Sequence, residues 1–420
     1  PGQIAAVESL RLRGMAALSG RHDMERMLAT VGLVSCPGMS PVAAGRQAVN
    51  AAGFRTIAEV ELAYRSLTGR VIAITRTNGK TTTTQLTTHI LTFAGIDAEA
   101  VGNVGRPLSE CALAEHQPDW VVVELSSFQL ADLDRFESEI GVLLNLSPDH
   151  LDRYRDVDSY YADKARLFDR ASEEPTWVLN ADDSAVLDLA AGVSGRRLIY
   201  SVEGEVPVGA WIDSEGGLLG RLIEGDSPLR WAGAEDIPLI GRHNVSNVLA
   251  ACLAAVTAGV APGKLSGALR SFHGLPHRLQ PVMERDGVLW VNDSKATNVA
   301  AAVAAVSAFD RPVILLLGGR HKGQPYTSLA EAAGERARVV IAFGEAAPLI
   351  VSELRDAVAT VLVESSLDSA VRTASDLSRP GDVVLLAPAC SSYDMFPNYL
   401  ERGRAFEAAV LGLQPAESAP

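Results

Sequence analysis

The chain has 420 residues, which is enough for two or three domains that each bury a core of their own. Its hydrophobic content of 47% and charged content of 21% are ordinary for a globular protein and exclude a disordered chain. The formal net charge of -14 argues against general binding to nucleic acids or to anionic membranes.

Short apolar runs alternate with amphipathic helical stretches along the chain, a pattern that predicts an α/β architecture with mostly parallel sheets. Up to residue 68 the pattern predicts a strand and then a helix, at 31–35 and 41–52. From Gly69 onward it predicts further strands, at 71–74, 120–124, 141–146 and 177–180, and one helix at 80–93. Residues 195–240, with alternating segments such as 209–212, favour an antiparallel insertion or edge. Two helices follow, at 244–258 and 264–271.

A third stretch begins after an expected hinge at 274–276. Its strands alternate with helices in the doubly wound manner, at 288–291, 313–317, 339–343 and 383–386. We therefore predict three domains, 1–68, 69–273 and 274–420, with residues 414–420 as a loose tail.

The four cysteines are scattered without paired spacing, which indicates reduced thiols rather than disulfides or a zinc site. No apolar run reaches the roughly 20 residues that span a bilayer, and the N-terminus lacks the pattern of a signal peptide. We expect a cytoplasmic protein that binds neither nucleic acid nor membrane and acts as a monomer.

Residues 75–82 form the first motif that carries chemistry. A strand leads into a short loop ending in Gly79-Lys80-Thr81, and a helix follows, so that backbone N–H groups and the helix dipole would point at a polyphosphate. Lys80 would neutralise phosphate charge, and Thr81 would hold Mg²⁺. The strict Walker A pattern is not met, because Ile74 stands where its first glycine belongs. The alternative is a plain turn with a surface lysine.

Three further candidates lie between residues 120 and 170. Glu124 ends the apolar strand and can ligate a metal there, or it is a solvated strand end. His150, after the next strand, would lie at the same sheet edge, although a lone histidine is more often a hydrogen-bonded loop residue. Lys164 lies on a helix beginning near Asp156, and nothing in the pattern separates it from a solvated lysine.

The remaining motifs follow or precede helices in the second half of the chain. Asn244 is a plausible helix N-cap, and the amide of Asn247 could read an adenine edge. The turns at 292–298, 318–323 and 388–396 each follow a strand, where ligand crevices form in open α/β sheets, and each is also explained by an ordinary capped or flexible turn. Cys390 is interpreted as a buried small residue rather than a nucleophile, because no histidine within the motif would activate it.

Together these motifs resemble the Mur ligase family. Residues 77–82 resemble a motif shared by the whole family, whereas 124–129, 293–298 and 388–392 resemble its D-glutamate-adding branch. The resemblance runs in order from about residue 31 to 412. It implies three domains: a truncated N-terminal Rossmann-like domain, a central P-loop ATPase-like domain and a C-terminal Rossmann-like domain.

The resemblance also implies an activity: ATP would phosphorylate the carboxylate of UDP-N-acetylmuramoyl-L-alanine, and the amine of D-glutamate would displace the phosphate, with Mg²⁺ as cofactor. The implied nucleotide contacts are Thr77, Asn78, Gly79, Lys80, Thr81, Thr82, Asn247, Arg278 and Asp293. The implied catalytic and metal-binding groups are Lys80, Thr81, Glu124, His150 and, if carbamylated, Lys164. The implied substrate contacts are Gly38, Asn103, Ser126, Lys295, Thr297, Lys322, Ser392, Tyr393 and Tyr399.

Two departures from the family pattern bear on activity. Arg76 stands where the family has glycine. An arginine would be strained there if the position required φ > 0, and its bulk would crowd ATP. The first strand, Gly-rich turn and helix of the N-terminal domain are also missing from the sequence. A homologue that binds ligands with little turnover is therefore one alternative. A relative that ligates glutamate to another carboxylate, such as folate, is a second.

Overall fold

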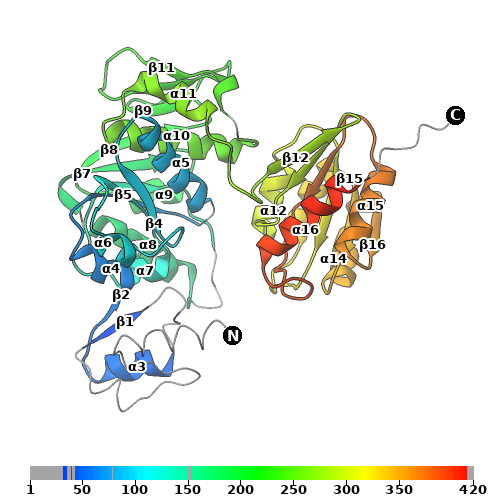
Figure 1. The fold of residues 1–420 in the computed structure, drawn as a ribbon, viewed down its shortest axis with the longest axis horizontal. Coiled ribbons are helices and arrows are strands. Elements are labelled where there is room, and N and C mark those ends of the chain that lie inside the picture. Colours follow the sequence, from blue (N-terminus) through cyan, green and yellow to red (C-terminus); the bar gives the residue numbers. More distant parts are fainter. Residues whose placement is uncertain are drawn as a thin grey trace. The chain divides into compact units, whose positions relative to one another are not determined.

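The computed structural model of the chain describes residues 32–35, 39, 43–77, 79–148, 154–169, 171–237 and 239–413. The chain divides into two compact units, Pro1–Ala234 with Val248–Ala268, and Glu235–Asn247 with Leu269–Pro420 (Figure 1). Among the described residues, no helix has the length and apolar character needed to cross a membrane. The predicted tail at 414–420 lies outside the described residues.

A nine-stranded sheet with the order β11-β10-β9-β8-β7-β6-β3-β5-β4 organises the first unit. Its strands are β3 (Arg70–Thr75), β4 (Ala98–Gly102), β5 (Trp120–Glu124), β6 (Ser138–Leu143), β7 (Ala171–Asn180), β8 (Arg196–Ser201), β9 (Gly209–Ile212), β10 (Leu218–Arg221) and β11 (Leu229–Ala232). Its helices are α5 (Lys80–Phe93), α6 (Leu108–Ala112), α7 (Ser127–Ala131), α8 (Val157–Asp169), α9 (Ser184–Leu189), α10 (Arg242–Thr257, shared with the second unit) and α11 (Leu265–Arg270).

The interior strand β3 pairs in parallel with β5 and β6, and it is apolar because it is buried on both faces. Ile72, Ala73 and Ile74 are fully buried. Together with β5 and α5, whose predicted bounds are confirmed, this strand fixes the position of the loop at 76–79.

Two predictions for this sheet were wrong in detail. The strand expected at 141–146 is β6, Ser138–Leu143, because the apolar residues Leu144 and Leu146 are buried in the loop that follows it. The 195–240 region is antiparallel only from β9 to β11, since β8 pairs in parallel with both β7 and β9. Alternating polarity indicates a strand but carries no information on its direction.

A small two-stranded parallel sheet of β1 (Leu33–Ser35) and β2 (Thr56–Ala58) precedes the large one, with α3 (Ala44–Ala51) between the strands and α4 (Glu59–Tyr64) after them. Glu61 of α4 is fully buried. Its Oε2 accepts three backbone N–H groups at 2.9 Å, from Asp134, Arg135 and Phe136. These bonds hold α4 against the loop after α7.

The second unit is built on a six-stranded sheet with the order β12-β13-β17-β14-β15-β16, parallel except for β12. The strands are β12 (Gln280–Arg285), β13 (Val288–Asn292), β14 (Val313–Gly318), β15 (Ala337–Phe343), β16 (Val361–Glu364) and β17 (Val383–Leu386). The helices are α12 (Val299–Val306), α13 (Thr327–Arg336), α14 (Ala347–Leu354), α15 (Leu367–Leu377) and α16 (Tyr399–Leu411).

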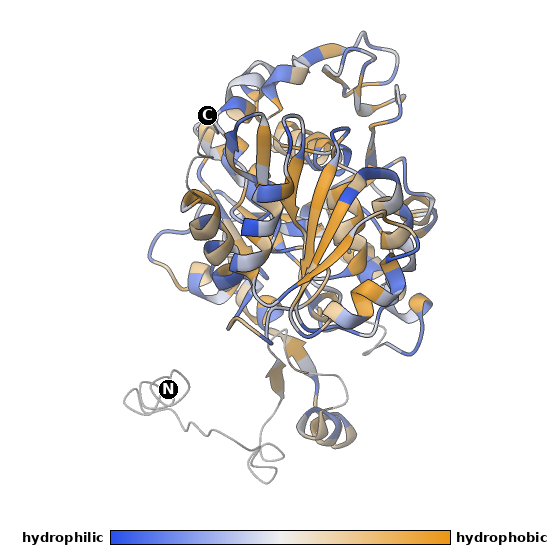
Figure 2. Ribbon diagram, turned by 90° about the vertical axis from the view of Figure 1, so that its right-hand side faces the viewer, coloured by the Kyte–Doolittle hydropathy of each residue, from blue (hydrophilic) through white to orange (hydrophobic). Residues whose placement is uncertain are grey.

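Alternate residues of β14 point to opposite faces of this sheet. Leu315 packs into the core formed with α12, α13 and α14, whereas Ile314 and Leu316 pack into the core formed with α15 and α16. The inner strands β14 and β17 are accordingly apolar and buried along their whole length, and Figure 2 shows mostly hydrophobic strands between the helices. Helices on both faces of a mostly parallel sheet confirm the predicted α/β class and its doubly wound third stretch.

Candidate active site

The phosphate-loop candidate lies between the last residue of β3 and the first residue of α5. Gly79 has φ 85°, a left-handed conformation that glycine adopts without strain. The Thr77 hydroxyl lies 3.1 Å from the Ser147 carbonyl and 3.1 Å from the Tyr160 hydroxyl. Thr82 is buried in the first turn of α5, next to the half-buried Thr81. Asn78 lies outside the described residues.

Two lysines meet at the backbone of this loop. Lys80 Nζ donates to the Arg76 carbonyl at 2.8 Å, and Lys164 Nζ donates to the same oxygen at 3.0 Å. Lys164 is only 1% exposed and also lies 4.9 Å from the centre of the Tyr160 ring. Tertiary packing therefore distinguishes Lys164, which the sequence pattern did not.

Arg76 is buried within the loop. It is not among the described residues with positive φ, so the strain expected at this position is absent. Its guanidinium lies against Gly79, where an added Cβ would stand 1.0 Å from Arg76 Nη2. Three cationic side chains at a helix N-terminus suit an anionic ligand, but a phosphate approaching Gly79 would first meet the guanidinium.

Glu124 ends β5 and is almost completely buried. Its Oε1 accepts a hydrogen bond from Asn103 Nδ2 at 3.0 Å, while its Oε2 is buried with no hydrogen-bond partner among the described residues. Asn103 is also held through its backbone N–H, which donates to the Glu124 carbonyl at 3.0 Å. The carboxylate thus keeps one oxygen for a further ligand, which fits a hard cation such as Mg²⁺.

Ser126, His150 and Gly38 are the remaining site candidates of the first unit. Ser126 is the N-cap of α7 and forms a capping box with Gln129, so its hydroxyl is engaged in the helix terminus. His150 and Gly38 lie outside the described residues. Within the described ranges, no group of three or more His, Cys, Asp or Glu side chains could enclose a metal ion.

The candidates for the base and sugar of the nucleotide lie in the second unit. Asn247 is buried and donates to Asn244 Oδ1 at 3.0 Å. The N-cap prediction for Asn244 was wrong, because α10 already begins at Arg242. Asp293 is buried, and burial raises the pKa of its carboxyl to about 7 against the opposing charge of Arg278. The structure therefore brings Arg278 and Asp293 within electrostatic reach of each other.

The residues predicted to contact the amino-acid substrate lie in the turns after β13, β14 and β17 and at the start of α16. Lys322 Nζ donates to Thr297 Oγ1 at 3.4 Å, and Lys295 Nζ lies 3.9 Å from the centre of the Tyr399 ring. Ser392 is buried, whereas its neighbour Tyr393 is 67% exposed. Because β13, β17 and β14 are adjacent and parallel, these side chains gather at one edge of the sheet.

Cys390 is fully buried, with its Sγ 2.9 Å from the Tyr326 hydroxyl. Burial raises the pKa of its thiol. The interpretation of Cys390 as a buried small residue is confirmed. Sequence reasoning missed Arg402, a fully buried arginine beneath these turns, because an arginine in an amphipathic helix gives no signal of burial.

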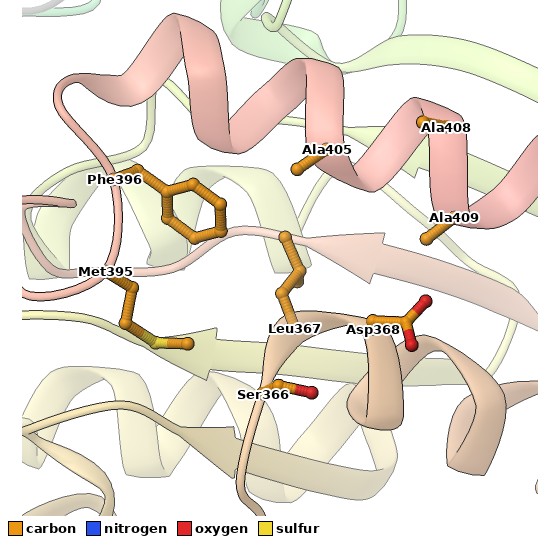
Figure 3. A pocket seen from close by; sticks show the side chains of 8 residues that line it. All are labelled: Ser366, Leu367, Asp368, Met395, Phe396, Ala405, Ala408 and Ala409. Atoms are coloured by element: carbon orange, nitrogen blue, oxygen red, sulfur yellow. The ribbon is translucent and has the colours of Figure 1, made fainter.

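A cavity of about 610 Å³ lies between α15 and α16 (Figure 3). Its wall is mostly apolar, with Leu367 and Phe396 facing the alanines of α16. None of the predicted site residues lines this cavity, so it is separate from the candidate site.

Comparisons with known proteins cover most of the chain. Residues 74–255 match the Mur ligase middle domain, and residues 277–390 match the family model described as Mur ligase, glutamate ligase domain. The UDP-N-acetylmuramoylalanine--D-glutamate ligase of Acidobacterium capsulatum is 40% identical over 405 residues, 96% of this chain and 87% of that protein. The protein of the same name from Solibacter usitatus is 42% identical over 366 residues, 87% of this chain and 81% of that protein.

Solved structures share the fold at lower identity. Structure I of MurF from Acinetobacter baumannii has a TM-score of 0.62 at 15% identity, with 91% of this chain and 92% of that chain covered. A pseudomurein peptide ligase type C from Methanothermus fervidus has a TM-score of 0.60 at 18% identity, with 90% and 88% covered.

Proposed function

The chain belongs to the Mur ligase family, and from that membership we propose that it joins D-glutamate to UDP-N-acetylmuramoyl-L-alanine at the expense of ATP. The observation that carries the proposal is the similarity, at about 40% identity and over most of both chains, to ligases named for that reaction. None of the comparisons favours a homologue with weakened turnover.

The reaction has two chemical steps. A carboxylate oxygen of the nucleotide sugar attacks the γ-phosphorus of ATP, which gives an acyl phosphate and ADP. The amine of D-glutamate then attacks the acyl carbon, loses a proton and expels inorganic phosphate as the amide forms. In phosphoryl transfer the protein mainly positions groups and neutralises charge, so the candidate residues are assigned on those grounds.

In this proposal the phosphates of ATP lie over the N-terminus of α5. Lys80 would neutralise phosphate charge, whereas the Arg76 guanidinium occupies the space beside Gly79 that a closely approaching phosphate would need. Thr81 and Glu124 would hold Mg²⁺, together with His150; the ion would screen the negative charge between phosphates and carboxylate. Lys164, fixed on the Arg76 carbonyl, would hold the loop in place or, if carbamylated, support the metal.

The second unit would supply the other contacts. Asn247, Arg278 and Asp293 are assigned to the nucleotide, and the side chains at the edge of the six-stranded sheet to D-glutamate. The latter are Lys295, Thr297, Lys322, Ser392, Tyr393 and Tyr399. Gly38, Asn103 and Ser126 are assigned to the nucleotide sugar. We place the reaction in the cytoplasm and take the monomer as the working form, in line with the free, buried thiols of Cys111, Cys252 and Cys390.

A phosphate-release assay tests the proposal. We expect release that requires ATP, Mg²⁺, UDP-N-acetylmuramoyl-L-alanine and D-glutamate together, and loss of activity on the order of 100-fold or more in Lys80→Ala. A panel of L- and D-amino acids supplies the specificity control. Release that is supported by another amino acid and not by D-glutamate would refute the assignment.

A further inference from the structure

Arg402 lies in the first turn of α16 and is completely buried. Burial lowers the pKa of its guanidinium to about 10, so the group keeps its charge at neutral pH. In the described part of the chain it forms no ion pair with a carboxylate, and the oxygens that accept its hydrogen bonds there are neutral. Burying a charged arginine without a carboxylate partner costs folding free energy, so helix packing alone does not explain this residue.

The partners of Arg402 come from three different turns. Nε donates to Ser294 Oγ at 3.0 Å, and Nη2 donates to the Ser294 carbonyl at 2.9 Å. Nη1 donates to the carbonyls of Gly318 at 3.3 Å and Cys390 at 3.1 Å. The planar guanidinium thus connects three segments: the turn after β13, the end of β14 and the turn after β17.

Those turns carry nearly all the residues assigned to D-glutamate. Lys295 and Thr297 follow Ser294, Lys322 follows Gly318, and Ser392 and Tyr393 follow Cys390. Tyr399 begins the helix of Arg402, and its carbonyl accepts from Ser294 Oγ at 2.8 Å. A change at Arg402 would therefore alter the spacing of every group in the candidate subsite.

The backbone leaves little room for another arrangement. A Cβ on Gly319 would lie 2.1 Å from the Ser391 carbonyl and 3.1 Å from Arg402 Nη1, so this close approach requires glycine. Arg320 and Ser391 exchange backbone hydrogen bonds at 2.8 and 3.1 Å, which joins two of the turns directly. Arg402 ties this pair to the third turn at Ser294.

We propose that Arg402 is a positioning residue of the amino-acid subsite, which sets the spacing of the three turns and places a fixed positive charge beneath a dicarboxylate substrate. The proposal rests on the proposed function for the identity of that substrate. Arginine suits the role because its five donors lie in one rigid plane. Lysine would keep the charge but could not hold three turns at fixed distances.

The test compares Arg402→Lys and Arg402→Gln with Arg404→Gln, which changes an exposed arginine two residues along the same helix that pairs with Glu401. For Arg402→Lys we expect the KM for D-glutamate to rise about tenfold while the KM for ATP changes less than about twofold. Arg402→Gln, which also lacks the charge, should raise the KM for D-glutamate further. Arg404→Gln should leave both values unchanged. Equal changes in all kinetic parameters, or a change in Tm alone, would show that Arg402 stabilises the fold and does not position the subsite.

Hydrogen exchange provides a readout that does not depend on catalysis. In Arg402→Lys we expect faster amide exchange in all three turns, at 293–298, 318–323 and 388–393, and no change in the first unit. Should the Arg402 variants not fold, Ser294→Ala removes the hydroxyl that accepts from Arg402 Nε and donates to the Tyr399 carbonyl, and it should raise the KM for D-glutamate about threefold. If amide exchange in the turns is unchanged, the proposed role of Arg402 is overturned, whichever amino acid the wild-type enzyme uses. If the wild-type enzyme does not depend on D-glutamate, only the proposed function is overturned.

Discussion

Arg76 places a guanidinium beside the one glycine of the phosphate loop that must admit a phosphate closely. The side chain has two possible effects on ATP, since it adds a positive charge and takes up space. Because its Nη2 lies within 1.0 Å of where a Cβ of Gly79 would stand, we give more weight to the steric effect.

We therefore expect Arg76→Gly to lower the KM for ATP about tenfold, equivalent to about 1.4 kcal/mol of binding free energy. Steady-state kinetics with varied ATP measures this change. Arg70→Ala, which removes the exposed arginine at the opposite end of β3, is the matched control and should leave the KM for ATP unchanged. A higher KM in Arg76→Gly would mean that the guanidinium binds phosphate rather than obstructing it.

Asn103 illustrates how a side-chain contact adds to an assignment. It is assigned to the nucleotide sugar, and in the structure its amide also donates to Glu124 Oε1, which leaves Oε2 available and points to an additional metal-positioning role. In Asn103→Ala the carboxylate would lose this orientation. We expect about a tenfold rise in the Mg²⁺ concentration for half-maximal activity, and weaker Mn²⁺ binding by electron paramagnetic resonance. A raised KM for the nucleotide sugar with unchanged metal dependence would leave only the assignment to the nucleotide sugar.

Asp293 should make the stability of the second unit depend on pH. Burial raises the pKa of its carboxyl from the ordinary value of 3.8 to about 7. Between these values the folded chain holds a proton that the unfolded chain has lost, so stability falls as the pH rises, by at most about 1.4 kcal/mol per pH unit. Above the folded pKa both states are ionised, and the slope disappears.

We expect Asp293→Asn to abolish this slope, because an amide does not titrate. The difference in Tm between the variant and the wild type should therefore become more positive from pH 5 to pH 8, as measured by differential scanning calorimetry. Identical pH dependence of the two proteins would show that Asp293 is ionised in the folded chain throughout this range.

At the scale of elements, one buried carboxylate of α4 forms hydrogen bonds to the loop after α7. The carboxylate of Glu61 accepts hydrogen bonds from three backbone N–H groups of that loop. Glu61→Ala would leave these donors buried and should cost on the order of 3 kcal/mol in the free energy of unfolding. Urea denaturation measures this loss. Glu110→Ala, an exposed glutamate of α6, is the control and should change stability by less than about 0.5 kcal/mol.

At the scale of the whole molecule, a ligand that binds only the folded chain must stabilise it. A nonhydrolysable ATP analogue with Mg²⁺, at about 100 times its Kd, should add about 2.7 kcal/mol to the free energy of unfolding and raise the Tm. The shift should shrink when EDTA removes the metal and vanish in Lys80→Ala. A wild-type Tm that stays constant through the titration would contradict a nucleotide site at this loop.

The sequence by itself determined the α/β class, the bounds of β5, α5 and β17, and the place of the Gly79 loop between β3 and α5. These features depend on residues that are close together in the chain: an apolar run, a glycine turn and the helix that follows. The predicted division into three domains, with boundaries at 68 and 273, stays a prediction, as do the roles assigned to the site residues.

Only the tertiary structure decided which distant residues meet. Lys164 reaches the Arg76 carbonyl across 88 residues of sequence, and Arg402 reaches Ser294 across 108. The direction of β8 and the pairing of Asn103 with Glu124 were settled in the same way. Local patterns specify whether a segment forms a helix or a strand, but burial of a charged side chain depends on which elements pack around it, and that is a property of the folded chain alone.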